Sequence, residues 1–121
     1  MYLNKCSKIV IKIGSSILID KKGKLKKSWL KEFINDINFL IKKNKKIIIV
    51  SSGAIALGCE YLKINKEKLK VEKSQAVASV GQIMLMDFYK KNFDKKKIKI
   101  SQILLTLDDT EQRRRSINAK R

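Results

Sequence analysis

The sequence contains no histidine and no proline, and only two cysteines occur among its 121 residues. The absence of histidine excludes serine–histidine and cysteine–histidine nucleophiles, and it removes the usual zinc patterns as well. Cys6 and Cys59 lie far apart in the sequence, which favours buried or idle thiols. The catalytic and metal-binding classes built on those residue types are therefore excluded.

Long hydrophobic runs are absent too. No stretch approaches the roughly 18 consecutive apolar residues typical of a membrane-spanning helix. The first residues, Met1 to Lys8, are polar and are not followed by a signal-like apolar segment with a small-residue cleavage site. The sequence therefore predicts a soluble protein that does not contact a membrane, and the cytoplasm is its expected location.

Acidic residues are scarce, with 11 Asp and Glu against 29 Lys and Arg, and the formal net charge is +18. Such an excess can be the footprint of nucleic-acid binding, because clustered basic side chains neutralise phosphates. The lysines, however, are spread over almost every segment, whereas arginine is confined to residues 113–115 and 121. With isoleucine and asparagine also abundant, we favour a codon bias toward adenine and thymine over specific nucleic-acid binding. Some nonspecific affinity for polyanions is expected in either case.

The stretch from Ile9 to Ser16 reads I-V-I-K-I-G-S-S. Its β-branched residues favour a strand buried on both faces, where the charge of Lys12 is costly unless it is paired. Gly14 permits a sharp turn or a close approach to a ligand, and the two serines that follow supply hydroxyl and amide donors suited to anion oxygens. The residues alone leave two interpretations open: a phosphate contact, or a strand lysine whose amine extends into water.

A parallel strand–helix–strand unit is predicted for the first half of the chain. The first strand covers about Lys8 to Ile13, and a second strand is expected at Ile47 to Val50. Between them, apolar residues recur at helical spacing after Ser28, a candidate N-cap, as far as Ile41. This order predicts two parallel strands joined by a helical crossover.

The second strand is followed by a turn of its own, Ser51 to Ala54, and then by a helix expected over Ile55 to Leu62. A strand, tight turn and helix can point backbone amides at an anion, although a serine N-cap with a purely structural role is the alternative. Parallel strands place both turns at the same carboxyl edge, where ligands bind in open α/β sheets. The sequence therefore predicts a ligand cleft between the two turns.

The second half of the chain predicts further α/β structure. A long helix is expected over Val71 to Phe93, with Gly81 and other small residues allowing close packing against another helix. A third strand is expected at Ile98 to Thr106, with its buried centre at residues 103–105. Asp108 or Asp109 then caps a last helix.

That last helix has no C-cap before Arg121, and three parallel strands would leave apolar edges unpaired. We therefore expect these residues to be the first part of a larger α/β domain that is cut within a helix.

Five ordered blocks carry a resemblance to a known family: Ile9–Ser16, Ile47–Gly58 (I-I-I-V-S-S-G-A-I-A-L-G), Gln75–Gln82 (Q-A-V-A-S-V-G-Q), Gln102–Thr106 (Q-I-L-L-T) and Arg113–Lys120 (R-R-R-S-I-N-A-K). In this order and spacing the chain resembles the N-terminal part of the amino-acid kinase domain of the glutamate 5-kinase branch. The resemblance implies a three-layer αβα sandwich with a mainly parallel sheet.

The resemblance also implies an activity: ATP-dependent phosphorylation of the side-chain carboxylate of L-glutamate to L-glutamyl 5-phosphate, the first step of proline biosynthesis. Magnesium would be held mainly through the phosphates, without a protein metal cluster, and the complete enzyme would be a homo-oligomer. The site residues that it implies are Lys12, as the phosphate-contacting and catalytic lysine, Gly14, Ser15 and Ser16 at the ATP phosphates, and Ser52, Gly53 and Ala54 at glutamate.

The family's catalytic aspartate, second phosphate-binding lysine and most of its nucleotide site would lie beyond residue 121. We therefore expect residues 1–121 alone to lack kinase activity. Two alternatives stay open: a related kinase of the same family with another substrate, and a noncatalytic module that binds anions or nucleic acid.

Overall fold

The structure, a computed structural model, describes residues 2–105 and residue 117. A short helix precedes the first strand, two helices lie between the strands, and two more helices and one 3₁₀ turn follow the second strand. In chain order the elements are α1 (Tyr2–Lys5), β1 (Lys8–Ile13), α2 (Ser15–Leu18), α3 (Lys27–Lys42), β2 (Lys46–Ser51), α4 (Ala54–Leu62), η1 (Lys66–Lys68) and α5 (Val71–Asp94).

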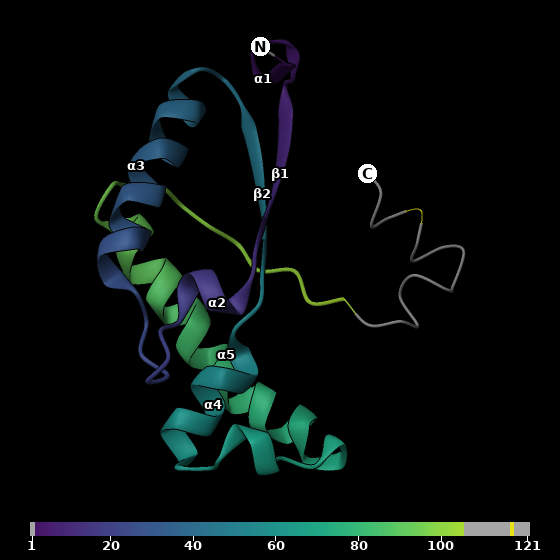
Figure 1. Cartoon of the computed structure of the whole chain (residues 1–121). Coiled ribbons are helices and arrows are strands. Elements are labelled where there is room, and N and C mark those ends of the chain that lie inside the picture. Colours follow the sequence, from purple (N-terminus) through teal and green to yellow (C-terminus); the bar gives the residue numbers. More distant parts are fainter. Residues whose placement is uncertain (1, 106–116, 118–121) are drawn as a thin grey trace.

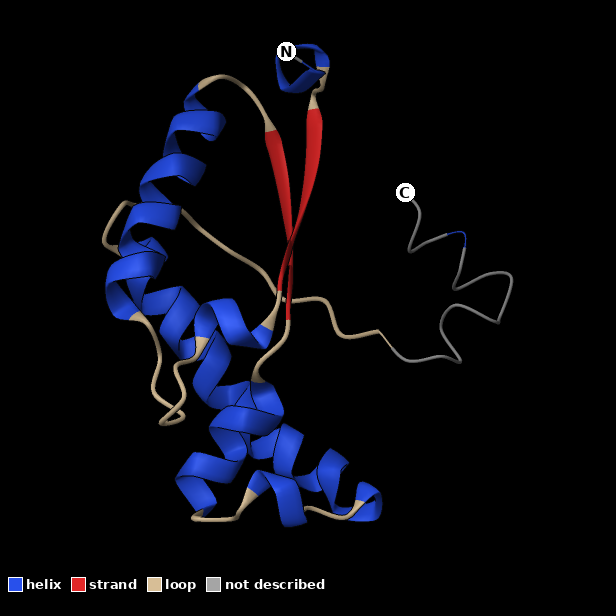
Figure 2. Ribbon diagram, viewed as in Figure 1, coloured by secondary structure: helices blue, strands red, loops and turns tan. Residues whose placement is uncertain are grey.

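The two strands pair in parallel, as the sequence predicts (Figure 2). Ile9 lies opposite Ile47, and the register continues to the pair Ile13 and Ser51 at the carboxyl end. The connection between the strands runs through α3 (Figure 1). The carboxyl ends of β1 and β2 therefore lie side by side, and a turn follows each of them.

The hydrophobic core lies between one face of this sheet and a helical layer. Helix α3 buries Leu30, Ile34 and Ile37, in agreement with its sequence periodicity. Helix α5 buries a stripe at intervals of four residues: Val77, Gly81, Leu85, Tyr89 and Phe93. Both helices pack on the face that carries Ile11, Ile13, Ile47 and Ile49 (Figures 1 and 2).

The prediction that the strands are buried on both faces is wrong for the described part of the chain. Val10 is 64% exposed and Ile48 is 56% exposed, and Lys12 shares this open face with them. Alternation along a strand sends successive side chains to opposite faces, and none of the described elements covers the second face. The described chain thus supplies two of the three layers of an αβα sandwich.

The predicted third strand is also wrong over residues 98–105, which pair with neither β1 nor β2. Ile98 and Ile100 pack against the core, but Ile103 is 78% exposed instead of lying at a buried strand centre. An apolar composition favours a strand, yet a strand forms only where a hydrogen-bonding neighbour is present. The helix expected after Asp108 or Asp109 lies outside the described residues.

Helix α3 begins two residues earlier than predicted. Its N-cap is Lys26, which makes no side-chain capping bond, so Ser28 lies inside the first turn and is not the cap. The cause is tertiary: the Lys26 amide donates to the Leu18 carbonyl at 2.8 Å, which fixes the chain direction at this point.

Among the described helices, none combines the length and apolarity that crossing a membrane requires.

Helices α4 and α5 approach each other closely through two glycines. A Cβ on Gly81 would overlap the carbonyl oxygen of Ala54 and lie 2.6 Å from the amide nitrogen of Gly58. A Cβ on Gly58 would in turn overlap the Val77 carbonyl oxygen. The prediction that Gly81 serves helix packing is confirmed, and this contact sets the position of Ala54, the first residue of α4.

Candidate functional site

The turn after β1 leads directly into α2. Gly14 is the N-cap of this helix with φ −76° and ψ 156°, a conformation open to any residue, so the glycine is not required for the turn. A Cβ at Gly14 would meet nothing within 4 Å. Neither backbone geometry nor packing of the described chain explains a glycine at this position.

The turn after β2 does require its glycine. Gly53 adopts φ +118°, in the left-handed region that side chains disfavour, and a Cβ there would lie 3.0 Å from the Ile19 side chain. Gly53 is the N-cap of α4 and makes no side-chain capping bond, while its carbonyl accepts the Leu57 amide at 3.0 Å. The nine-residue helix α4 therefore starts at the carboxyl end of β2, with the positive end of its dipole there.

One cavity of about 350 Å³ joins the two turns; we call it the turn cavity. It brings Ser15 from the first turn together with the second turn and the start of α4. The arrangement agrees with the prediction that parallel strands place both turns at one edge. Its lining residues are Ser15, Ser51, Ser52, Gly53, Ala54, Ile55, Ala56, Lys66 and Ala78.

The other predicted residues of the first turn lie around this cavity and do not line it. Lys12 is exposed, two residues before Gly14, on the open face of the sheet opposite Val50. Ser16 lines the neighbouring larger cavity, and its carbonyl accepts a hydrogen bond from Lys26 Nζ at 3.0 Å. The described residues thus bring Ser15 to Ser52, Gly53 and Ala54 but leave Lys12 outside the turn cavity.

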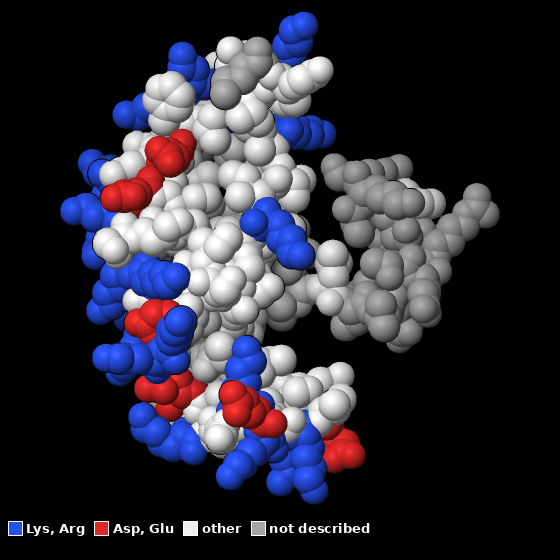
Figure 3. All heavy atoms as spheres, in the orientation of Figure 1, with Lys and Arg blue, Asp and Glu red and all other residues white. Residues whose placement is uncertain are grey.

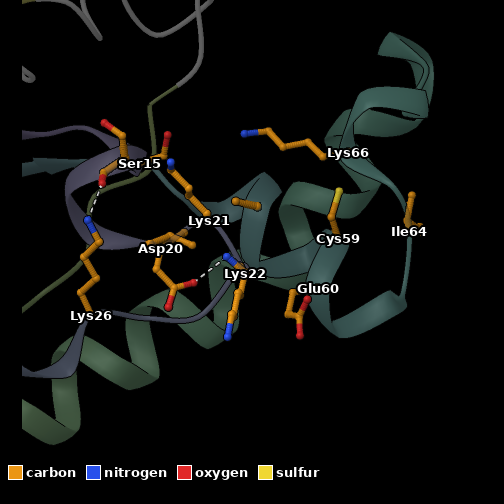
Figure 4. A pocket seen from close by; sticks show the side chains of 13 residues that line it. Ser15, Asp20, Lys21, Lys22, Lys26, Cys59, Glu60, Ile64 and Lys66 are labelled. Atoms are coloured by element: carbon orange, nitrogen blue, oxygen red, sulfur yellow. Dashed lines mark hydrogen bonds between the residues drawn. The ribbon is translucent and has the colours of Figure 1, made fainter.

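The larger cavity, about 680 Å³, shares Ser15, Ala56 and Lys66 with the turn cavity; we call it the lysine cavity. In Figure 4 Lys66 extends across the cavity from one side and Lys21 extends toward Ser15 on the other, with Cys59 and Glu60 along the α4 side. Asp20 closes the loop beneath by accepting the amides of Lys22 and Lys24 at 2.8 and 3.0 Å. The Lys24 amide is the main cause that lowers the pKa of this carboxyl.

Sequence reasoning missed Lys66 and Tyr89. Lys66 lines both cavities from η1, and no motif marked it. Tyr89 is 4% exposed, and its hydroxyl lies 2.8 Å from Ser51 Oγ. The spacing of four residues from Val77 through Leu85 to Phe93 could have identified Tyr89 as a core position, but not its hydrogen bond.

The turn cavity offers no carboxylate among its lining residues. In the described part of the chain, no three Asp, Glu or Cys side chains come together in a way that could hold a metal ion. Magnesium prefers carboxylates and phosphate oxygens as ligands. The residues of this cavity therefore do not fit a magnesium site of their own.

Lysines surround much of the visible face of the molecule in Figure 3, separated by uncharged residues and a few acidic side chains. They do not gather into a single stripe on that face. The distribution agrees with the interpretation drawn from the sequence, in which the excess of lysine is spread over surface positions. Nonspecific binding of polyanions stays a prediction.

Comparison with known proteins adds a family to this geometry. The family model described as "Amino acid kinase family" matches residues 7–121. A protein of Pelagibacter ubique named glutamate 5-kinase is 65% identical over 121 residues, which is 100% of this chain and 33% of that relative.

Two further relatives carry the same name. The protein of Sinorhizobium fredii is 50% identical over 118 residues, covering 98% of this chain and 30% of the relative. The protein of Bartonella henselae is 50% identical over 113 residues, covering 93% and 30% respectively. The chain therefore spans about a third of the length of the curated relatives that it matches.

Proposed function

This chain belongs to the amino acid kinase family, and from that premise we propose that it forms the N-terminal part of a glutamate 5-kinase. The reaction would transfer the γ-phosphoryl group of ATP to the side-chain carboxylate of L-glutamate, giving L-glutamyl 5-phosphate and ADP. The observation that carries the proposal is the turn cavity, which joins Ser15 to the residues from Ser51 to Ala56. ATP and glutamate are both anionic, so the reaction needs two neighbouring groups of hydrogen-bond donors, one for each reactant.

The start of α4 suits the carboxylate substrate. Gly53, Ala54 and Ile55 line the turn cavity at the positive end of the helix, where backbone amides and the dipole favour an anion. The Ser52 side chain is exposed at the same place and can donate a hydrogen bond. We assign Ser52, Gly53 and Ala54 to the binding of glutamate.

The first turn suits the phosphates of ATP. The open space over Gly14 lets a phosphate oxygen approach the backbone, and Ser15 and Ser16 supply donors beside it. Lys12 lies two residues earlier, near the carboxyl end of β1, where its amine can offset charge on the transferred group. Phosphoryl transfer depends mainly on such positioning and electrostatic stabilisation.

Further properties belong to the same proposal. Magnesium would be held mainly by the ATP phosphates and by residues outside the turn cavity, since the cavity lacks carboxylates. The complete enzyme would act in the cytoplasm, in proline biosynthesis, as a homo-oligomer.

The activity test uses a completed enzyme, in which residues 1–121 are followed by the part of the Pelagibacter ubique relative that this chain does not cover. It should release ADP only when both L-glutamate and ATP are present, and hydroxylamine should trap the acyl phosphate. Residues 1–121 alone, purified free of other kinases, should release no ADP. The turn cavity would supply only part of the active site, and the catalytic aspartate and second phosphate-binding lysine that the resemblance implies would lie beyond residue 121. Glutamate-dependent ADP release by the chain alone would contradict this prediction.

The same assay separates the alternatives. ADP release with another carboxylate or phosphate acceptor, but not with glutamate, would indicate a related kinase of the family. A folded completed enzyme that phosphorylates nothing, yet binds nucleic acid with sequence preference and steep salt dependence, would indicate the noncatalytic alternative.

Gly14→Ala separates ligand approach from folding. The φ of Gly14 is open to alanine and the space above it is empty, so the unfolding midpoint of the completed enzyme should change little. If the ATP phosphates approach this backbone, the methyl group should raise the KM for ATP about tenfold, a loss of about 1.4 kcal/mol of binding. The measurement is ATP-dependent ADP release together with thermal unfolding, and an unchanged KM would remove Gly14 from the phosphate site.

A further inference from the structure

Helix α5 reaches the end of β2 through one buried hydroxyl. Tyr89 is 4% exposed, and its ring packs within the core cluster that includes Ile13, Leu85 and Phe93. Its hydroxyl oxygen lies 2.8 Å from Ser51 Oγ. A buried phenol hydroxyl needs a hydrogen-bond partner, and here that partner is the last residue of β2, immediately before Ser52.

The direction of the bonds follows from the proton count. Ser51 Oγ donates its single proton to the Ser52 carbonyl at 3.0 Å, so it can only accept from Tyr89. The Ser52 amide donates to the Ile13 carbonyl at 2.9 Å. A series of hydrogen bonds thus runs from Tyr89 through Ser51 to the Ser52 carbonyl, while a separate bond to Ile13 holds the Ser52 amide.

We propose that Tyr89 is a positioning residue for the substrate-binding turn, acting through Ser51 on Ser52. Ser51 and Ser52 both line the turn cavity, whereas Tyr89 does not and so touches no substrate there. Losing the Tyr89 hydroxyl would release the Ser51 side chain to other rotamers and loosen the Ser52 carbonyl. The inference rests on the proposed function, in which this turn holds the carboxylate of glutamate.

The tyrosine is suited to this role at neutral pH. Burial raises the pKa of the Tyr89 phenol, and the bond to Ser51 lowers it by a smaller amount. The hydroxyl therefore keeps the proton that it donates to Ser51 throughout the neutral range. Among the described residues, Ser51 is the hydrogen-bond partner of the Tyr89 hydroxyl.

The test compares Tyr89→Phe and Ser51→Ala in the completed enzyme. Each should raise the KM for glutamate about fivefold, the loss expected for one hydrogen bond, while the KM for ATP stays unchanged. The double variant should show no further rise in the KM for glutamate, because both substitutions break the same hydrogen-bond series from Tyr89 through Ser51 to Ser52. Ser51→Thr keeps a hydroxyl and should retain a near-normal KM for glutamate. Tyr61→Phe, at a side chain 65% exposed, is the matched control.

The outcomes distinguish this inference from the proposed function. No glutamate phosphorylation by the unmodified completed enzyme would overturn the proposed function itself. An active enzyme in which Tyr89→Phe and Ser51→Ala leave the KM for glutamate within about twofold, or in which their effects add, would overturn the positioning role. A lower unfolding midpoint with an unchanged KM would show that Tyr89 serves only the core.

Discussion

Replacing Lys12 with alanine is expected to lower the turnover number of the completed enzyme about 10²–10³-fold, the loss typical of removing one preorganised donor to developing charge. The fold should survive. Lys12 is exposed on the open face of the sheet and takes part in no ion pair within residues 2–105, so its removal leaves no buried group without a partner. The measurement is kcat for glutamate-dependent ADP release, with thermal unfolding measured in parallel.

Lys8 provides the matched control. It lies on the same face of β1 as Lys12, at the opposite end of the strand from the two turns. Lys8→Ala removes the same charge from the same face and should leave turnover nearly unchanged. Near-normal activity of the Lys12→Ala variant would remove Lys12 from its proposed role, and equal losses in both variants would indicate a general effect of charge.

Replacing Gly81 with alanine is expected to destabilise the completed enzyme by about 3 kcal/mol, the upper part of the range for overpacking. The added Cβ would meet the backbone of Ala54 and Gly58, which cannot rotate away as a side chain can. Relief requires α4 to move away from α5. Because Ala54 begins α4 and lines the turn cavity, activity should fall together with stability.

Thermal unfolding of the Gly81→Ala variant should therefore show a midpoint several degrees lower. Gly14→Ala is the matched control, since the same substitution there adds a methyl group to open space. An unchanged midpoint in the Gly81 variant would mean that α4 and α5 do not pack as closely as described.

Local patterns were sufficient for β1, β2 and α3, and for the proximity of the two turns. The β-branched runs predicted β1 and β2, and the helical spacing after residue 28 predicted α3. Parallel pairing then implied that Ser15 and the turn at Ser52 to Ala54 would share one edge, as they do in the turn cavity. The strand and helix signals are local, and a strand–helix–strand order favours parallel pairing of the two strands.

Other features could not be read locally. Residues 98–105 have a strand-like composition, but a strand needs a paired neighbour, and in the described chain they have none. In a strand made of β-branched apolar residues, the sequence does not show which of the two faces is covered. The exposure of Val10 and Lys12 therefore depended on which layers cover the sheet. The bond between Tyr89 and Ser51 joins residues 38 positions apart.

By itself, then, the sequence determined an α/β chain of the amino acid kinase family with two glycine turns at one sheet edge, because strand, turn and helix signals are local and the motif blocks are ordered. Only the tertiary structure decided that Gly53 and Gly81 are required by geometry while Gly14 is not. It alone placed Ser15, Lys66 and the start of α4 around one cavity and Tyr89 beneath it. Close approach, cavities and buried hydrogen bonds arise between distant segments, and no short stretch of residues encodes them.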